Sequence, residues 1–293
     1  MKNILFKIQG KIYRCIAKLF KYRPISYPYI SGDGFRSMAE HIYDETVKCD
    51  ATNIKNNNIV FLKADMIKEW FELIHPQINC KYKLITHNSD SRVGEKEALF
   101  VDDKIIKWYA QNNTFKHEKI IPIPIGIENK SIFVNGWSLM KVAKKLKNET
   151  GKRKKDKILY GFNVNTNIKE RTTALNSLKK CSVSEGIKSR ITPIEYNEIL
   201  SKYKFVASPE GNGPDCIRTW EAMVYGVIPI IRNVSNCQVI SQNSLPIMLI
   251  NDWREIEGLN EEKLIEIYNN NDLSKKSGIN MFDYWQKIIK NNE

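Results

Sequence analysis

Hydrophobic residues recur along the first half of the chain in short continuous runs that alternate with longer amphipathic stretches. The continuous runs predict strands at 26–30, 59–62, 83–87 and 105–109. The amphipathic stretches predict helices at 35–47, 66–74 and 95–100, and a proline-rich segment follows at 120–127. Because strands alternate with helices, the pattern predicts a parallel sheet covered on both faces.

A second set of the same alternation begins at residue 158. Its apolar runs predict strands at 158–162, 204–208, 227–232 and 246–250. Its amphipathic stretches predict helices at 170–180, 193–202, 215–225, 259–269 and 281–290. The two sets together predict an α/β protein with two Rossmann-like domains that face a central cleft, where the carboxyl ends of their strands would hold a ligand.

The charged residues are unevenly distributed along the chain. The net charge is +13, from 46 Lys and Arg against 33 Asp and Glu. Segment 1–23 holds seven basic and no acidic residues, and segment 141–157 holds nine basic and two acidic ones, so the rest of the chain is nearly neutral. We therefore expect a helix over 1–23, a first α/β domain over 24–140, a basic linker over 141–157, and a second α/β domain with C-terminal helices over 158–293.

A charge confined to two segments does not form the broad basic surface that nucleic acid requires, so no nucleic-acid partner is expected. The six cysteines include no CxxC pair, and a chain of this length needs no disulfide staples. Reduced thiols in the cytoplasm are the expected state.

The N-terminal segment has the pattern of a basic amphipathic helix. Ile4, Ile8, Ile12, Ile16 and Phe20 recur every four residues among basic positions, and the longest uncharged stretch, 3–6, is too short for an export signal or a membrane span. Two interpretations remain open. The helix either lies on an anionic membrane, which would place the protein on the inner face of the cell membrane, or packs on its own globule.

The segment 205–222 is a strand, a glycine loop and a helix in sequence. Gly211 and Gly213 allow a sharp turn close to a ligand, and Asp215 is placed to cap the helix. Arg218 in the first turn can bind a diphosphate, and Glu221 on the same face can accept hydrogen bonds from a ribose. The alternative is a tight turn with an Arg–Glu pair on a solvated helix.

The run 208–221 and the apolar residues that follow to 231 resemble the nucleotide-sugar-binding motif of exostosin-like glycosyltransferases. The segments 29–36, 86–90 and 121–127 are similar to bacterial surface-glycan members of that group. The resemblance implies a GT-B-type glycosyltransferase fold, with the donor in the second domain and the acceptor in the first. It also implies metal-independent inversion at the anomeric carbon, and the chain has no Asp-x-Asp motif.

Donor-site residues follow from the same resemblance. Arg218 would hold the donor phosphates and Glu221 the ribose, with Glu210, Asn212 and Gly213 near the transferred sugar. Asn163, Asn165 and Arg171 would close the phosphate site from the other side. For Arg171, an exposed helix charge is the alternative interpretation.

An inverting transferase needs a general base for the acceptor hydroxyl, and three residues of the first domain qualify. Asp33 lies between two glycines, while His87 and Asp90 lie in the loop after a predicted strand. Asp33 could instead form a turn, and Asp90 could cap a helix. Lys63 and Arg36 could steady an anionic acceptor or the leaving phosphate.

The sequence thus predicts an enzyme that moves a sugar from a nucleotide-sugar donor to a glycan acceptor. A lipid-linked acceptor in surface polysaccharide or lipopolysaccharide synthesis would agree with the basic helix. No cofactor is expected beyond the donor substrate. The alternative is a non-catalytic nucleotide-sugar- or glycan-binding protein of the same fold.

Overall fold

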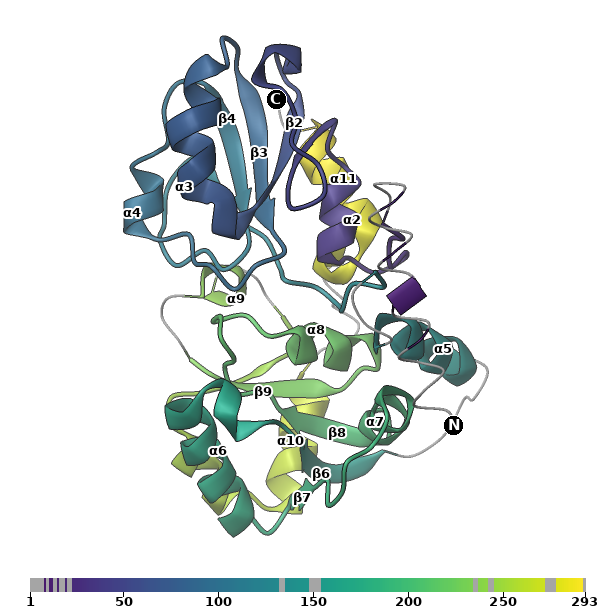
Figure 1. Ribbon diagram of the computed structural model, residues 1–293. Helices are drawn as coiled ribbons and strands as arrows, with labels where there is room; N and C mark the ends of the chain where they lie inside the picture. The colour runs from purple at the N-terminus through teal and green to yellow at the C-terminus, as the bar shows by residue number, and fades with distance from the viewer. Residues whose placement is uncertain are drawn as a thin grey trace. The chain divides into compact units, whose positions relative to one another are not determined.

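The computed structural model describes residues 23–131, 135–147, 154–233, 237–241, 245–271 and 278–291, with the separate positions 8, 11, 12, 15 and 19. The chain forms two units, each built on a five-stranded parallel sheet (Figure 1). Unit 1 comprises 1–133, 235–243 and 281–293, and unit 2 comprises 134–234 and 244–280.

The sheet of unit 1 follows the order of the sequence. Its strands are β1 (His41–Tyr43), β2 (Ile59–Lys63), β3 (Tyr82–His87), β4 (Ile105–Ala110) and β5 (Ile120–Pro122). Leu84 of β3 is in register with Val60 of β2 and Trp108 of β4. Every residue of β3 is buried, as expected for the central strand of a covered parallel sheet.

Different helices cover the two faces of this sheet. On one face, α3 (Ile67–Glu69) lies within a helical stretch from Ala64 to Gln77, whose Phe71 ring packs 5.4 Å from that of Trp108. On the other, Lys83 of β3 donates a hydrogen bond of 3.0 Å to the carbonyl of Ile289 in α11 (Phe282–Asn291). Short helices α2 (Gly32–Arg36), α4 (Glu95–Ala98) and α9 (Gln238–Ser241) belong to the same unit.

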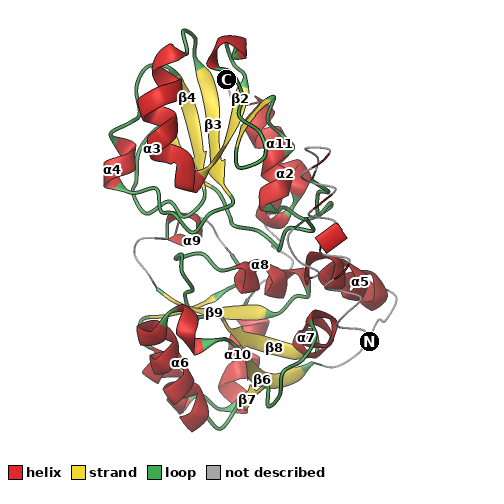
Figure 2. Cartoon of the chain, viewed as in Figure 1, coloured by secondary structure: helices red, strands yellow, loops and turns green. Residues whose placement is uncertain are grey.

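The sheet of unit 2 has the strand order β10-β9-β8-β6-β7. Its strands are β6 (Lys155–Tyr160), β7 (Ser184–Gly186), β8 (Tyr203–Ala207), β9 (Ile228–Arg232) and β10 (Met248–Ile250). Figure 2 shows these strands among helices α5 (Asn135–Lys147), α6 (Ile168–Lys180), α7 (Pro193–Leu200), α8 (Ile217–Val224) and α10 (Glu261–Asn270). Ile158, Phe205 and Trp253 lie in its core.

The predicted α/β class with two Rossmann-like domains is confirmed, and the cleft between them remains a prediction. The strand expected at 26–30 is wrong, because this stretch makes only an isolated bridge, at Tyr29. The helix expected at 35–47 is also wrong. The chain leaves α2 after Arg36 and forms β1, and a turn follows because the Asp44 carboxylate accepts the backbone N–H groups of Thr46 and Val47.

The boundaries of the units also differ from those expected at 24–140, 141–157 and 158–293. Much of the expected linker is α5, a helix of unit 2 that packs on α7, because Leu139 and Val142 give it a buried face among its lysines. The C-terminal helix α11 belongs to unit 1 rather than to the second domain. Among the described helices, none has the length and apolar composition needed to cross a membrane.

Candidate functional site

Two arginines come together at the carboxyl ends of β6 and β8 in unit 2. Arg171 on α6 donates from Nε to the carbonyl of Glu210 and from Nη1 to the carbonyl of Asn163, each at 2.8 Å. Arg218 on α8 donates to the Tyr196 hydroxyl at 3.3 Å and to the carbonyl of Gly161 at 3.4 Å. Each guanidinium carbon lies 5.9 Å from the centroid of the same Phe162 ring. Both guanidinium groups therefore lie near the same aromatic ring.

The hydrogen-bond acceptors of the two guanidinium groups are uncharged. They are backbone carbonyls and the Tyr196 phenol. The Glu221 carboxylate attracts Arg218 electrostatically. Burial lowers the pKa of Arg171, and the charge of Arg218 lowers it further. Two cations held close to each other form a candidate site for a multivalent anion, because the anion would relieve their mutual repulsion.

The loops around the arginines are held by backbone contacts. Asn167 accepts a hydrogen bond from the Glu170 N–H as the N-cap of α6 and donates to the Gly211 carbonyl at 3.1 Å. A side chain at Gly211 would come within 3.1 Å of Arg171 Nη2, so glycine allows the loop to approach the guanidinium. Asn163 is exposed and its side chain accepts the Asn165 N–H, so it is the backbone carbonyl of Asn163 that meets Arg171.

The other predicted donor residues lie on the same loop and helix. Glu210 is buried and its carboxylate accepts a hydrogen bond from Arg232 at 3.2 Å. Glu221 is buried one turn after Arg218, while Gly213 is buried and Asn212 exposed in the loop. The expected cap by Asp215 is wrong, because Cys216 occupies the N-cap position of α8 and the Asp215 carboxylate accepts the Trp220 indole N–H instead.

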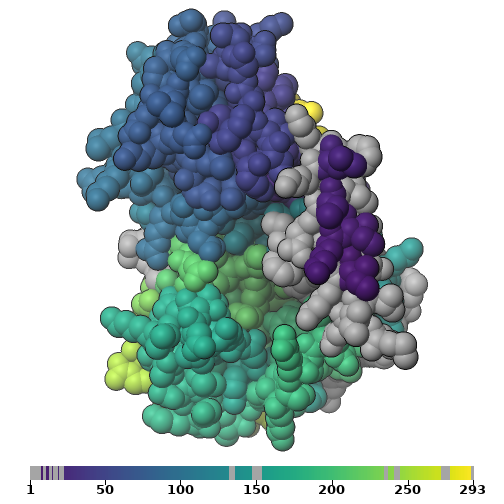
Figure 3. Space-filling view, viewed as in Figure 1, coloured from purple at the N-terminus to yellow at the C-terminus, as the bar shows by residue number. Residues whose placement is uncertain are grey.

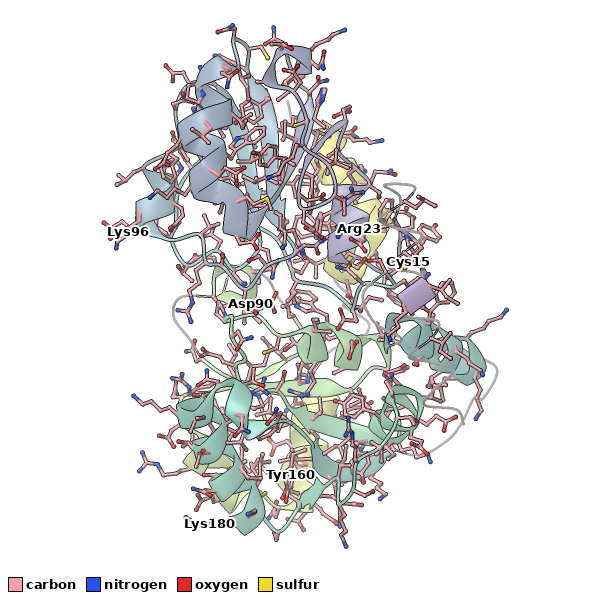
Figure 4. All side chains as sticks on the ribbon, in the orientation of Figure 1. Cys15, Arg23, Asp90, Lys96, Tyr160 and Lys180 are labelled. Atoms are coloured by element: carbon pink, nitrogen blue, oxygen red, sulfur yellow. The ribbon has the colours of Figure 1, made fainter. Side chains whose placement is uncertain are left out.

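Unit 1 holds a second polar cluster, around Asp33 in α2. The Asp33 carboxylate is only 1% exposed and accepts hydrogen bonds from Arg23 at 3.3 Å, from Asn88 at 3.3 Å, and from the Ser131 hydroxyl. Figure 4 shows Arg23 beside α2. Burial raises the pKa of Asp33, and the nearby Arg23 charge opposes this rise.

His87, at the end of β3, joins the same cluster through Asn88. Its Nδ1 accepts the Asn88 backbone N–H at 2.7 Å, and its Nε2 lies 3.1 Å from the Pro124 carbonyl. Burial lowers the pKa of His87 to about 4, so the ring is neutral near pH 7, with Nε2 as donor. Asp90, three residues further along, is exposed in the loop after β3 (Figure 4).

The two cations proposed to steady an anion in the first domain are engaged elsewhere. Lys63 forms ion pairs with Asp65 at 3.1 Å and Glu45 at 3.6 Å. Arg36 pairs with Asp44 at 2.7 Å. Both cations are therefore held by neighbouring carboxylates.

One acidic residue of this cluster is absent from the sequence-based set. Glu128 follows β5, and its Oε1 accepts the Asn129 backbone N–H at 3.1 Å. Burial raises the pKa of Glu128 to about 7; the Asn129 hydrogen bond opposes this rise, and the negative charge of Asp33 adds to it. The signal that could have revealed it was its position directly after the proline-rich segment 120–127. Phe162 and Tyr196 were also missed, since aromatic residues carry no motif of their own.

One family profile matches the second part of the chain. The sequence profile of the RXYLT1 C-terminal domain matches residues 164–292, which include both arginines and the glycine loop. No curated protein sequence matches the chain.

Several solved structures have a similar architecture. An α,α-trehalose-phosphate synthase (UDP-forming) from Burkholderia vietnamiensis is 8% identical over 82% of this chain and 73% of that chain, with a TM-score of 0.43. An E. coli structure described as trehalose-6-phosphate bound with UDP-2-fluoro glucose is 9% identical over 82% and 74%, with a TM-score of 0.45. TarM is 13% identical over 88% and 54%, with a TM-score of 0.37. At these scores the fold assignment rests on the two sheets themselves.

The fold and the arginine pair define a class of protein. The chain has two Rossmann-like units, and the arginine pair lies inside the region matched by the RXYLT1 C-terminal domain. The described residues hold no group of three or more His, Cys, Asp or Glu side chains placed to bind a metal ion.

Proposed function

We propose that this protein is a GT-B-type glycosyltransferase that binds the diphosphate of a nucleotide-sugar donor through Arg171 and Arg218. The observation that supports this most directly is the pair of guanidinium groups beside Phe162, whose hydrogen-bond acceptors are uncharged. A diphosphate carries charge and oxygen atoms that suit two planar, multidentate donors. Glu221 is proposed to bind the ribose, and Glu210, Asn212 and Gly213 to lie near the sugar, with Asn163 and Asn165 at the other side of the phosphates.

The proposal extends to an inverting, metal-independent transfer onto a glycan acceptor bound by unit 1. We further propose that the acceptor is lipid-linked, in the synthesis of surface polysaccharide or lipopolysaccharide at the inner face of the cell membrane. The N-terminal segment supports this. Ile8 and Ile12, from the predicted apolar stripe, are 47% and 50% exposed, and Leu19 is 76% exposed. Figure 3 shows the described N-terminal positions, in purple, at the surface. Exposed apolar side chains among lysines favour an anionic lipid surface.

Binding of nucleoside diphosphates by titration calorimetry tests the donor site. We expect one of UDP, GDP, ADP, CDP and dTDP to bind, and Arg218→Ala to weaken that binding by about 1.5 to 3 kcal/mol, the scale of a lost charge-assisted hydrogen bond. Arg171→Ala should have a similar effect. Arg254→Ala is the matched control, since the Arg254 side chain is 76% exposed and pairs with Asp252. Equal affinity in the wild type and the Arg218 variant would contradict the assignment.

The non-catalytic alternative is tested by the same protein. Asp33 and His87 are both engaged in internal hydrogen bonds, so neither is in the state expected of a free base. This observation favours the non-catalytic alternative. Donor binding without release of nucleoside diphosphate from any nucleotide sugar would support the alternative. Release of nucleoside diphosphate from the matching nucleotide sugar would support the transferase.

A further inference from the structure

We propose that Glu128 is the general base that accepts the proton of the acceptor hydroxyl. This rests on the proposed transferase function. Glu128 lies in the loop after β5, at the carboxyl edge of the unit 1 sheet, beside Asp33 and Asn129. Ligands of open α/β sheets bind at this edge.

Geometry separates Glu128 from the two other buried candidates. The Asp33 carboxylate is surrounded by Arg23, Asn88 and Ser131, so its lone pairs are already directed at donors of the protein. Both ring nitrogens of His87 have backbone partners. Each of these side chains would have to break internal hydrogen bonds before it could accept a substrate proton, and a buried polar group left without its partner is costly.

Glu128 could accept a substrate proton without first breaking an internal hydrogen bond. Its Oε1 accepts the Asn129 N–H, and no donor among the described residues pairs with its Oε2. No cation there forms an ion pair with it, and the residue stays partly exposed. One carboxylate oxygen is therefore left for a substrate hydroxyl.

The loop that carries Glu128 is fixed on both sides. Ile127 donates its N–H to the Ile30 carbonyl at 3.0 Å, and the Asn129 side chain accepts the Asp33 N–H at 2.7 Å and donates to Asn88 at 2.9 Å. Lys130 donates to the Ile25 carbonyl at 2.8 Å. Fixed neighbours hold a base in one orientation, which general base catalysis requires.

The cluster also supplies the right basicity. Burial, with the negative charge of Asp33, brings the pKa of Glu128 to about 7, close to the value at which a base works best near neutral pH. The other charged groups nearby are Arg23, which pairs with Asp33, and Lys130, whose ammonium is bound to a carbonyl.

The chemical step balances without a further reagent. Oε2 of Glu128 forms a bond to the proton of the acceptor hydroxyl as the acceptor oxygen bonds to the anomeric carbon. The bond from the anomeric carbon to the diphosphate breaks, and its electron pair leaves on the phosphate oxygen. The nucleoside diphosphate departs, and the proton on Glu128 passes to solvent.

The test compares Glu128→Gln with the exposed control Glu118→Gln in the full-length chain. The measurement is the release of nucleoside diphosphate, with water as acceptor, from sugars activated by whichever nucleoside diphosphate binds. We expect Glu128→Gln to slow release by at least about 100-fold, the lower range for loss of a general base, and to leave the affinity for nucleoside diphosphate unchanged. Glu118→Gln should match the wild type.

A pH profile separates catalysis from structure. The wild-type rate should rise with pH up to about 7 and then level off, since only the ionised carboxylate accepts a proton, and Glu128→Gln should lack this rise. If Glu128→Gln does not fold, Glu128→Asp serves instead. Its rate should be lower than that of the wild type but should still rise with pH.

The outcomes are distinct. A wild-type rate and pH profile in Glu128→Gln, with donor binding intact, overturns the assignment, and loss of rate in Asp90→Asn would then identify Asp90. Failure of the wild type to bind any nucleoside diphosphate, or to release one from any nucleotide sugar, overturns the transferase function and this proposal with it.

Discussion

Burial changes the chemistry of individual side chains in the unit 1 cluster. It raises the pKa of the Asp33 carboxyl and lowers that of the His87 imidazole, and so favours the neutral form of each. Both residues stood in the sequence as candidate bases because of their type and position. Their hydrogen bonds to Ser131 and Pro124 fit a role in fixing the loops.

The neutral state of His87 predicts how stability depends on pH. Its folded pKa of about 4 lies below the ordinary value of 6.5, so the unfolded chain binds the extra proton first as pH falls. The contribution of neutral His87 to the free energy of unfolding is therefore fully present above about pH 6.5 and is lost as pH falls through about 4. The total loss is about 3 kcal/mol.

Urea unfolding at about pH 7 and at about pH 4.5 measures this dependence. In His87→Gln we expect lower stability at neutral pH but a flatter decline towards acid. His117→Gln, at a partly exposed site, should keep the wild-type slope. A His87→Gln slope equal to that of the wild type would show that other groups cause the acid sensitivity.

At the scale of elements, the interior strands are the part of the fold that the sequence predicts best. β2, β3, β8 and β9 lie within one or two residues of their expected positions, because a strand buried on both faces is a run of apolar residues. The edge strands β1 and β7 were missed. Ser184–Gly186 carries no apolar residue, and its place in the sheet comes from pairing with β6, which a local pattern does not record.

The arginine site of unit 2 and the Asp33 cluster of unit 1 also differ in how far the sequence could predict them. The donor loop and Arg218 lie within one continuous segment, so its motif was visible in the sequence. The cluster of Asp33, Asn88 and Asn129 joins positions that are 41 to 96 residues apart. Only long-range packing brings Glu128 next to Asp33, so its position directly after the proline-rich segment 120–127 was the one local signal.

Packing at the end of β5 predicts the effect of a single methyl group. Gly126 has φ of +69° and a Cβ there would lie 2.4 Å from the Ile30 carbonyl oxygen. We expect Gly126→Ala to destabilise unit 1 by at least about 2 kcal/mol, from the left-handed backbone and the clash together. Gly258→Ala is the control, because nothing lies within 4 Å of its added methyl group. Equal urea midpoints for the two variants would contradict this account.

At the scale of the whole molecule, residues distant in sequence complete unit 1. The Phe282 N–H donates to the Pro28 carbonyl at 2.9 Å, and Lys83 of the central strand donates to Ile289 in the last helix. The chain leaves unit 1 at residue 133 and returns to it twice. Unit 1 therefore depends on segments that the chain reaches only after most of unit 2, while Arg171 and Arg218, the proposed donor site, lie wholly within unit 2.

Because of this arrangement, we expect a substitution in the core of α11 to lower the stability of unit 1 without weakening the binding of nucleoside diphosphate by unit 2. Trp285 is 3% exposed and its ring packs 5.7 Å from Phe35 of α2, whereas the neighbouring Tyr284 is 40% exposed. We expect Trp285→Ala to destabilise unit 1 by about 3 to 5 kcal/mol, the usual cost of removing a buried aromatic side chain. Tyr284→Ala should cost about 1 kcal/mol or less, because Tyr284 is already partly exposed to water.

Scanning calorimetry with and without the nucleoside diphosphate that binds the wild type distinguishes the units. In Trp285→Ala, the transition of unit 1 should move to lower temperature, while a second transition still shifts upward on adding the ligand, because binding stabilises only the unit that holds the arginines. A single transition that moves as a whole, with loss of nucleotide affinity, would show instead that unit 2 requires a folded unit 1. In that case α11 would support the donor site as well as the acceptor side, and the two functions would be lost together.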